Sequence, residues 1–241
     1  MTAILKREFA SYFTSPLGYV YLAVFYGFSG LFLWITCLTS GSADMQYVFL
    51  WMFFIMMILI PILTMRTMAD DKRQKTDQLT LTAPVSLFGI VAGKFLAAFF
   101  IFLIGAAVML VYALGLSAAV AGSDTGLTFA WASFFGNFVG IILMGAVFIS
   151  AGIFISSLTE NQMIAAIGSI GLNILLCLFD VISNFVSVDF LKDIINSLSV
   201  LYKYREFTYG IFSLKNILFF LSMIVIFNFL TMRIIERRRW S

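Results

Sequence analysis

The chain has 241 residues, of which 62% are hydrophobic and only 11% are charged, and its mean hydropathy is +1.04. With 15 basic and 12 acidic side chains it cannot cover that much apolar surface in water, which excludes a soluble globular domain and indicates a membrane protein. The absence of His removes the commonest metal ligand and proton shuttle. Cys37 and Cys177 lie far apart in apolar runs and are expected to be buried hydrophobic residues. We therefore expect no metal or cofactor site in this chain.

Charge-free gaps locate the membrane-spanning segments, because a charge at the centre of a bilayer costs several kcal/mol. Six gaps are apolar and long enough for a helix of about 20 residues, which the hydrocarbon core requires. A seventh gap, 78–93, contains too many polar residues to span. The sequence therefore predicts an all-α integral membrane protein with six transmembrane helices. The predicted spans lie at about 18–38, 45–65, 96–120, 134–157, 163–181 and 216–235.

Lys and Arg are distributed unevenly between the segments that connect these spans. If the N-terminus lies inside, eleven of the fifteen basic residues fall in cytoplasmic segments. The positive-inside rule therefore predicts a multi-pass protein with both termini in the cytoplasm. A cleaved signal peptide is the alternative for the N-terminus, but the first apolar run is about twice the usual length of a signal core.

Two segments outside the spans have the pattern of amphipathic helices. Residues 1–14 place Leu5, Phe9 and Tyr12 on one side, which predicts a helix lying along the inner interface. The alternative for this segment is a frayed extension of the first span. Residues 189–199 carry an apolar stripe and predict a helix on the outer side. Asp180, at the outer end of the fifth span, is expected at the level of the lipid headgroups.

The chain lacks the residues that catalysis or ion-coupled transport requires. The stretch "GIVAGKF" (89–95) is not a phosphate-binding loop, because its spacer is one residue short and no Ser or Thr follows Lys94. No nucleophile–base set can form without His, and no pair of facing carboxylates is expected, so we expect no enzymatic activity in this chain by itself. The spans contain no clear ionisable residue that could couple transport to protons or ions. Energy for uphill transport must then come from a partner.

A few polar and small residues within the spans stand out. Gly136 and Gly140 form a GxxxG pattern, which predicts a close helix contact. The polar residues are candidates for lining a transport path, although helix packing explains each of them equally well. These candidates are Asn137, Ser150, Asn173 and Thr64.

The stretch "MRTMADDKRQKTDQLTLTAP" (65–84) carries seven charges within twelve residues, far more than its surroundings. Two acids precede three basic residues, which is typical of a helix with an acidic start and an Asp71–Lys75 pair, and Pro84 would end that helix. A helix with charges of both signs favours specific docking of a soluble partner. The alternative is a solvated loop that supplies only a topology signal.

Four regions of the sequence resemble the permeases of type-2 ABC exporters, most closely those of gliding motility and of nitrous-oxide-reductase maturation. The resemblance implies six helices per subunit, a second permease copy, a cytoplasmic ABC ATPase dimer that uses ATP and Mg, a membrane-anchored auxiliary protein, and a place in the bacterial cytoplasmic membrane. We expect no nucleic-acid partner. The four regions are "LKREFASYFTSPLGYVY" (5–21), "PILTMRTMADDKRQKTDQLTLTAPVSLFGIVAGKF" (61–95), "FISSLTENQMIAA" (154–166) and "GIFSLKNILFFLSMIVIFNFLTMRIIERRRW" (210–240).

The resemblance also implies roles for three segments. Helix 67–82 would be the coupling helix that contacts the ATPase, the 156–162 turn a second contact, and 181–213 an outer re-entrant pair of helices. Lys75 and Gln78 depart from the family, which usually has Gly and Glu at these positions. The docking residues predicted in this way are Arg66, Asp70, Asp71, Lys72, Arg73, Lys75, Thr76, Gln78, Leu79, Glu160 and Asn161.

These observations lead to one main hypothesis about function and two alternatives. The main hypothesis is the membrane-spanning permease subunit of an ATP-driven exporter. The first alternative is a membrane scaffold that anchors other proteins without moving a solute. The second is a stand-alone secondary transporter, which the absence of ionisable residues from the spans disfavours.

Overall fold

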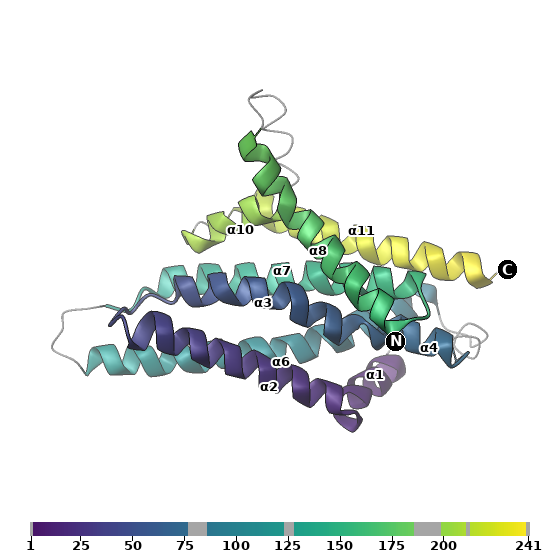
Figure 1. Ribbon diagram of the computed structural model, residues 1–241, viewed down its shortest axis with the longest axis horizontal. Coiled ribbons are helices and arrows are strands. Elements are labelled where there is room, and N and C mark those ends of the chain that lie inside the picture. The colour runs from purple at the N-terminus through teal and green to yellow at the C-terminus, as the bar shows by residue number, and fades with distance from the viewer. Residues whose placement is uncertain (1, 77–85, 123–127, 186–198, 211–212, 240–241) are drawn as a thin grey trace.

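The structure is a computed structural model of the chain and describes residues 2–76, 86–122, 128–185, 199–210 and 213–239. Every regular element in these residues is a helix, as the sequence predicts (Figure 1). The helices are α1 (Thr2–Thr14), α2 (Pro16–Leu33), the π-helical η1 (Trp34–Leu38), α3 (Gln46–Thr64), α4 (Arg66–Arg73), α6 (Leu87–Ala121), α7 (Trp131–Leu158), α8 (Gln162–Phe185), α10 (Val200–Thr208) and α11 (Leu214–Arg239).

Six segments of the described chain are long and apolar enough to cross a membrane, which confirms the predicted number of spans. They are α2 with η1, α3 with α4, α6, α7, α8 and α11. α6, the helix of the third span, begins at Leu87, well before the predicted start at 96, because Ser86 caps it by accepting a hydrogen bond from the backbone N–H of Gly89 at 3.2 Å. The N-terminus, α4 and the C-terminus lie at one end of the bundle, which we call the α4 end (Figure 1).

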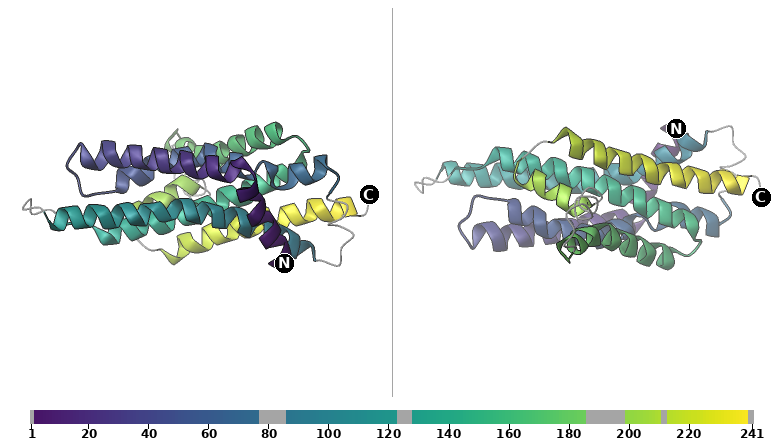
Figure 2. Two further views of the ribbon diagram at one scale, coloured as in Figure 1. Left: turned by 90° about the horizontal axis from the view of Figure 1, so that it is seen from below. Right: turned by 90° about the horizontal axis from the view of Figure 1, so that it is seen from above.

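The N-terminal segment forms a helix of its own, as predicted. Ser15 is extended between α1 and α2, and Pro16 occupies the first position of α2, where its missing N–H costs no hydrogen bond. α1 crosses the neighbouring spans at a steep angle (Figure 2), so the alternative of a frayed extension of the first span is wrong. Its apolar side packs on the bundle through Leu5, Phe9 and the buried Tyr12.

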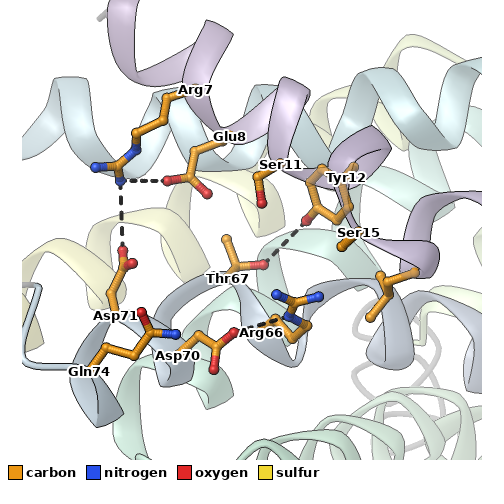
Figure 3. Close-up of a pocket in the computed structure, with 11 residues that line it drawn as sticks. Arg7, Glu8, Ser11, Tyr12, Ser15, Arg66, Thr67, Asp70, Asp71 and Gln74 are labelled. Carbon is orange, nitrogen blue, oxygen red and sulfur yellow. Dashed lines mark hydrogen bonds and ion pairs between the residues drawn. The ribbon is translucent and has the colours of Figure 1, made fainter.

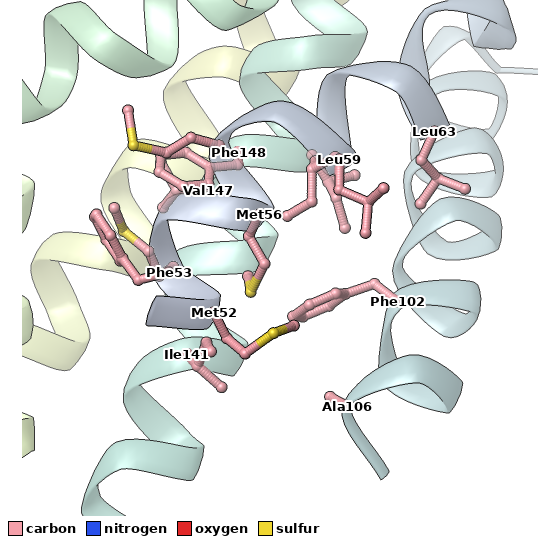
Figure 4. Packing of buried hydrophobic residues seen from close by; sticks show 14 of the residues in the cluster. Met52, Phe53, Met56, Leu59, Leu63, Phe102, Ala106, Ile141, Val147 and Phe148 are labelled. Atoms are coloured by element: carbon pink, nitrogen blue, oxygen red, sulfur yellow. The ribbon is translucent and has the colours of Figure 1, made fainter. Parts of the chain in front are cut away.

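The core is centred on α7, which packs against α3, α6, α8, α10 and α11. Aromatic and methionine side chains from α3, α6 and α7 fill this core, including the fully buried Met52, Phe53, Phe102 and Phe148 (Figure 4). Because the unbranched side chain of Met adapts to irregular spaces, methionines can fill the gaps that the rigid rings of Phe leave between tilted helices.

The glycine pattern on α7 brings α10 into close contact, as its spacing predicts. A Cβ at Gly136 would lie 2.5 Å from the carbonyl oxygen of Phe207, and one at Gly140 would lie 2.9 Å from the Cβ of Phe207. α10 can therefore rest on α7 only where α7 has no side chain.

Part of the predicted outer helical region is described. In the sequence, α10 lies between the fifth span, α8, and the sixth span, α11. The helix predicted at 189–199 falls almost entirely outside the described residues. Asp180 near the end of α8 is buried and accepts a hydrogen bond from Nη2 of Arg205 on α10 at 2.9 Å. This ion pair holds α10 against α8.

Candidate functional site

The charged stretch begins as a helix, α4, that continues α3. α4 follows α3 after a single turn residue, Met65, and ends at Arg73. Lys75 then adopts a left-handed backbone with φ of 57°, so the helix predicted through residue 82 is wrong from residue 74 to 76, and its remainder lies outside the described residues. Because Lys75 has left the helix, no ion pair joins it to Asp71 in the described structure. The helical ion pairs that form instead both use Asp70, which pairs with Nε of Arg66 at 3.0 Å and with Nη2 of Arg73 at 3.5 Å.

The predicted docking residues of α4 differ in burial, because Arg66, Asp70 and Asp71 are half-buried, whereas one residue is buried and one is exposed. Lys72 is buried and its ammonium donates to the backbone carbonyl of Ser157, so its side chain lies inside the bundle in this conformation, and its role as a contact for a soluble partner stays a prediction. The helical period explains the difference, since Lys72 follows the buried Met68 by four residues and lies on the same stripe. Arg73 and Lys75 are exposed. Gln78 and Leu79 lie outside the described residues.

The second predicted contact, the turn between α7 and α8, lies directly beside α4. Gln162 donates from Nε2 to Oδ1 of Asp70, while Glu160 and Asn161 remain exposed. Two segments about ninety residues apart in sequence therefore form one surface at the α4 end. We call this surface the α4–turn surface, and its exposed predicted residues are Arg73, Lys75, Glu160 and Asn161.

Ser156 of α7 forms hydrogen bonds with the backbone where α3 ends and α4 begins. Its hydroxyl accepts hydrogen bonds from the backbone N–H groups of Met68 and Ala69, both at 3.1 Å, and donates to the carbonyl of Met65 at 3.0 Å. A single side chain thus completes the hydrogen bonding of the helix around its irregular residue.

Replacing Ser156 by alanine is expected to destabilise the protein by about 1–3 kcal/mol, because two buried N–H groups lose their acceptor. Ser157→Ala is the matched control, since the hydroxyl of Ser157 bonds only to the carbonyl of Phe154 on its own helix. Thermal unfolding of the purified protein in detergent measures both variants. Equal unfolding temperatures for the two variants would show that the junction between α3 and α4 does not depend on Ser156.

A buried lysine connects α6 to α1 and α4. The side chain of Lys94 is 2% exposed and its ammonium donates to Oε1 of Glu8 at 3.0 Å and to the carbonyl of Thr67 at 2.6 Å, and it pairs with Oδ2 of Asp71 at 2.6 Å. Three acceptors match the three N–H groups of the ammonium. Glu8 and Asp71 therefore share the ammonium of one lysine, an arrangement that the sequence does not predict.

Two further contacts attach α1 to α4. The hydroxyl of Tyr12 donates to the carbonyl of Leu63 at 3.3 Å and lies 3.5 Å from Oγ1 of Thr67, and burial raises the pKa of Tyr12 to about 12. Arg7 bridges Glu8 and Asp71 on the outer side of the cluster (Figure 3). The hydrogen bond to Glu8 raises the pKa of Arg7, so the guanidinium stays charged.

The predicted path-lining residues are buried and bonded within the bundle. Asn137 donates to the carbonyl of Thr208 at 3.4 Å and so helps to hold α10, while Ser150 and Thr64 donate to carbonyls of their own helices. Asn173 of α8 donates to the carbonyl of Met57 at 3.4 Å. Each of the four side chains thus donates a hydrogen bond within the bundle, but Oδ1 of Asn137 and Oδ1 of Asn173 are buried and accept none from the described residues.

Sequence reasoning missed Glu8 and Lys94 as members of the site, and within the predicted 156–162 turn it did not single out Ser156 or Gln162. Lys94 offered a signal, because a lysine in the second turn of an apolar helix needs an acidic partner once it is buried. Ser156 and Gln162 offered none, since a serine or glutamine near the end of a span is an ordinary residue there.

A comparison with protein families places these features in a known class. The model of the ABC-2 family transporter protein matches residues 3–240, which is nearly the whole chain. The chain therefore belongs to the ABC-2 family of transporter membrane proteins, whose members act as permease components of ABC transporters together with an ABC ATPase. A comparison with the curated proteins finds no match.

Proposed function

We propose that this chain is the permease subunit of an ATP-driven exporter, in which a separate cytoplasmic ATPase dimer supplies the energy. The observation that carries the proposal is the α4–turn surface, where the two predicted docking segments meet. Arg73 and Lys75 offer positive charge and Glu160 offers negative charge, beside the exposed Leu158 and Ile164. Charges of both signs around apolar side chains suit a specific protein interface, whereas attraction to anionic lipid would need basic residues alone.

The bonds behind this surface provide a route by which movement of α4 would reach the spans. α4 is joined to α1 and α6 through Lys94 and to α7 and α8 through Ser156 and Gln162. A partner that holds α4 differently in its two nucleotide states would therefore act on four helices at once. Such differential contact is what a ligand needs in order to shift a conformational equilibrium.

The proposed assembly follows from the orientation that the positive-inside rule predicts. The α4 end faces the cytoplasm of a bacterium, so both termini are cytoplasmic and the chain lies in the cytoplasmic membrane. Two permease copies, identical or related, bind one ATPase dimer, which holds ATP and Mg. A membrane-anchored auxiliary protein completes the complex, as in the permeases of gliding motility and nitrous-oxide-reductase maturation that the sequence resembles.

Reversing the exposed charges of α4 tests the docking surface. The double variant Arg73→Glu with Lys75→Glu is expected to weaken ATPase binding roughly tenfold or more, since charge pairs at an interface are often worth a few kcal/mol. Glu160→Lys should act in the same direction but less, because it changes one charge. Co-purification of the ATPase with the permease measures the loss, with permease levels checked in the membrane fraction.

The matched control is the double reversal Arg233→Glu with Arg237→Glu, which changes two exposed arginines of α11 at the same end of the bundle. This control should retain the ATPase. Full ATPase binding by the α4 double variant would contradict the docking role. Binding that is lost in the variant but never responds to nucleotide would instead favour the scaffold hypothesis.

A further inference from the structure

The α4 end also carries a groove that changes from apolar to charged along its length. Its apolar part lies between α2 and α3 and is lined by Val20, Val24, Leu59 and Ile62. Its polar part reaches Arg66, Asp70, Arg73 and Gln162, and the whole groove encloses about 620 Å³. We call it the α2–α3 groove.

A second, polar cavity of about 290 Å³ adjoins this groove between α1 and α4 (Figure 3). Leu17, Arg66, Asp70 and Gln74 line both, so the two spaces are neighbours. The α2–α3 groove is thus an apolar channel with a polar chamber beside its charged end. From Leu17 to Val24 the channel follows roughly 10 Å of helix at 1.5 Å per residue.

The charged end of the groove presents guanidinium groups rather than carboxylates. The Asp70 side chain is 15% exposed, and its oxygens already accept from Arg66, Arg73 and Gln162. Arg66 uses Nε for this bond, so its two terminal nitrogens have no partner among the described residues. The side chains of Arg66 and Arg73 are 36% and 64% exposed. Asp70 thus orients a fork of N–H donors toward the groove, an arrangement that matches a phosphate.

We propose that the α2–α3 groove binds a glycerophospholipid of the adjacent leaflet, with its phosphodiester on Arg66 and Arg73 and one acyl chain along Val20 and Ile62. Both parts of the ligand are needed to explain the groove. An apolar helix from a second copy of the chain would cover both arginines without supplying an acceptor, at the cost of burying two guanidinium groups that share the single carboxylate of Asp70. A soluble phosphate would leave the apolar channel empty.

Titration of the purified full-length chain in detergent with dioleoylphosphatidylglycerol, followed by native mass spectrometry, tests the proposal. Arg66→Gln is expected to weaken binding of the first lipid roughly tenfold, because charge-assisted bonds to the phosphate are lost. Arg233→Gln is the matched control, since Arg233 also pairs with an acid of its own helix and lies at the same end, but not in the groove. It should change binding less than twofold.

A second pair of variants tests the acyl-chain channel. Val20→Trp fills the groove and should also weaken lipid binding, whereas Val111→Trp, at a similarly exposed valine of α6 outside the groove, should not. This pair keeps the test decisive if Arg66→Gln fails to fold. Glycerol phosphate, added in place of the lipid, should not bind measurably.

Three results would overturn the proposal. Equal lipid binding by the parent and by both groove variants would mean that only nonspecific lipid is retained. Glycerol phosphate binding as tightly as the lipid would mean an anion site without an acyl-chain channel. Unchanged lipid binding, with Val20→Trp converting a dimer to monomers, would mean that the groove is an interface between two copies. No ATPase is present in these experiments, so their outcome is independent of the docking proposal.

Discussion

Replacing Lys94 by methionine is expected to lower the unfolding temperature by roughly 6 °C or more, the largest effect of any single substitution proposed for this chain. The variant removes the buried cation that Glu8 and Asp71 share, leaving them only the exposed Arg7 on the outer side of the cluster, and it leaves the carbonyl of Thr67 without its donor. Removing one partner of a buried ion pair costs about 3–5 kcal/mol, because the remaining charge stays in a poorly solvated place. Thermal unfolding in detergent, followed by intrinsic fluorescence, measures the change.

The triple variant Lys94→Met, Glu8→Gln, Asp71→Asn distinguishes the loss of charge balance from the loss of packing. Removal of the two acids should recover most of the stability, because neutral groups are cheaper to bury than an unpaired carboxylate. Lys215→Met, at an exposed lysine, serves as the control for a lost surface charge and should unfold like the parent. A Lys94→Met variant as stable as the parent would mean that the cluster does not hold the three helices together.

Gly136→Ala is expected to separate α10 from α7 and to unfold roughly 4 °C below a control substitution, since overpacking costs about 1–3 kcal/mol. The added Cβ would lie 2.5 Å from the carbonyl oxygen of Phe207 and 2.9 Å from the Cα of Gly210. Both neighbours are backbone atoms, so no side-chain rotation can relieve the contact. Unfolding temperature in detergent is again the measurement.

Gly171→Ala is the matched control for this contact, because a Cβ at Gly171 would meet nothing within 4 Å. Alanine is the better helix former by about 1 kcal/mol, so the control should unfold at or slightly above the temperature of the parent. The difference between the two variants then isolates the clash from helix propensity. Identical behaviour of both would show that α10 can move away from α7 at no cost.

The six spans were predictable because the cost of burying charge acts on each segment separately. Gaps between charged residues therefore located the helices without any knowledge of their packing. The ends of the helices were harder to predict from the sequence, since they depend on local caps such as Ser86 and on backbone turns such as that at Lys75. The separate N-terminal helix was also predictable, from its stripe of apolar residues and from Pro16.

The partners of the charged residues could not be predicted, because they come from distant parts of the chain. Glu8 and Lys94 are 86 residues apart, and nothing in the sequence near either one indicates the other. Lys72 and Arg73 look equivalent in sequence, yet the helix turns one toward α7 and the other toward solvent. Which charges remain for a partner protein is thus a property of the fold, and the α4–turn surface is smaller than the charged stretch suggests.

Pro61 lowers the energy that is needed to bend α3 at this position. A proline supplies no N–H, so the carbonyl of Met57, four residues earlier, has no backbone partner, and Asn173 of α8 donates to it instead at 3.4 Å. A helix that flexes at this point need break only one long side-chain hydrogen bond rather than a rung of its own ladder. The end of α3 after Pro61, with α4 attached, can therefore turn relative to the rest of α3, and the bond from Asn173 joins α8 to the point where this turn occurs.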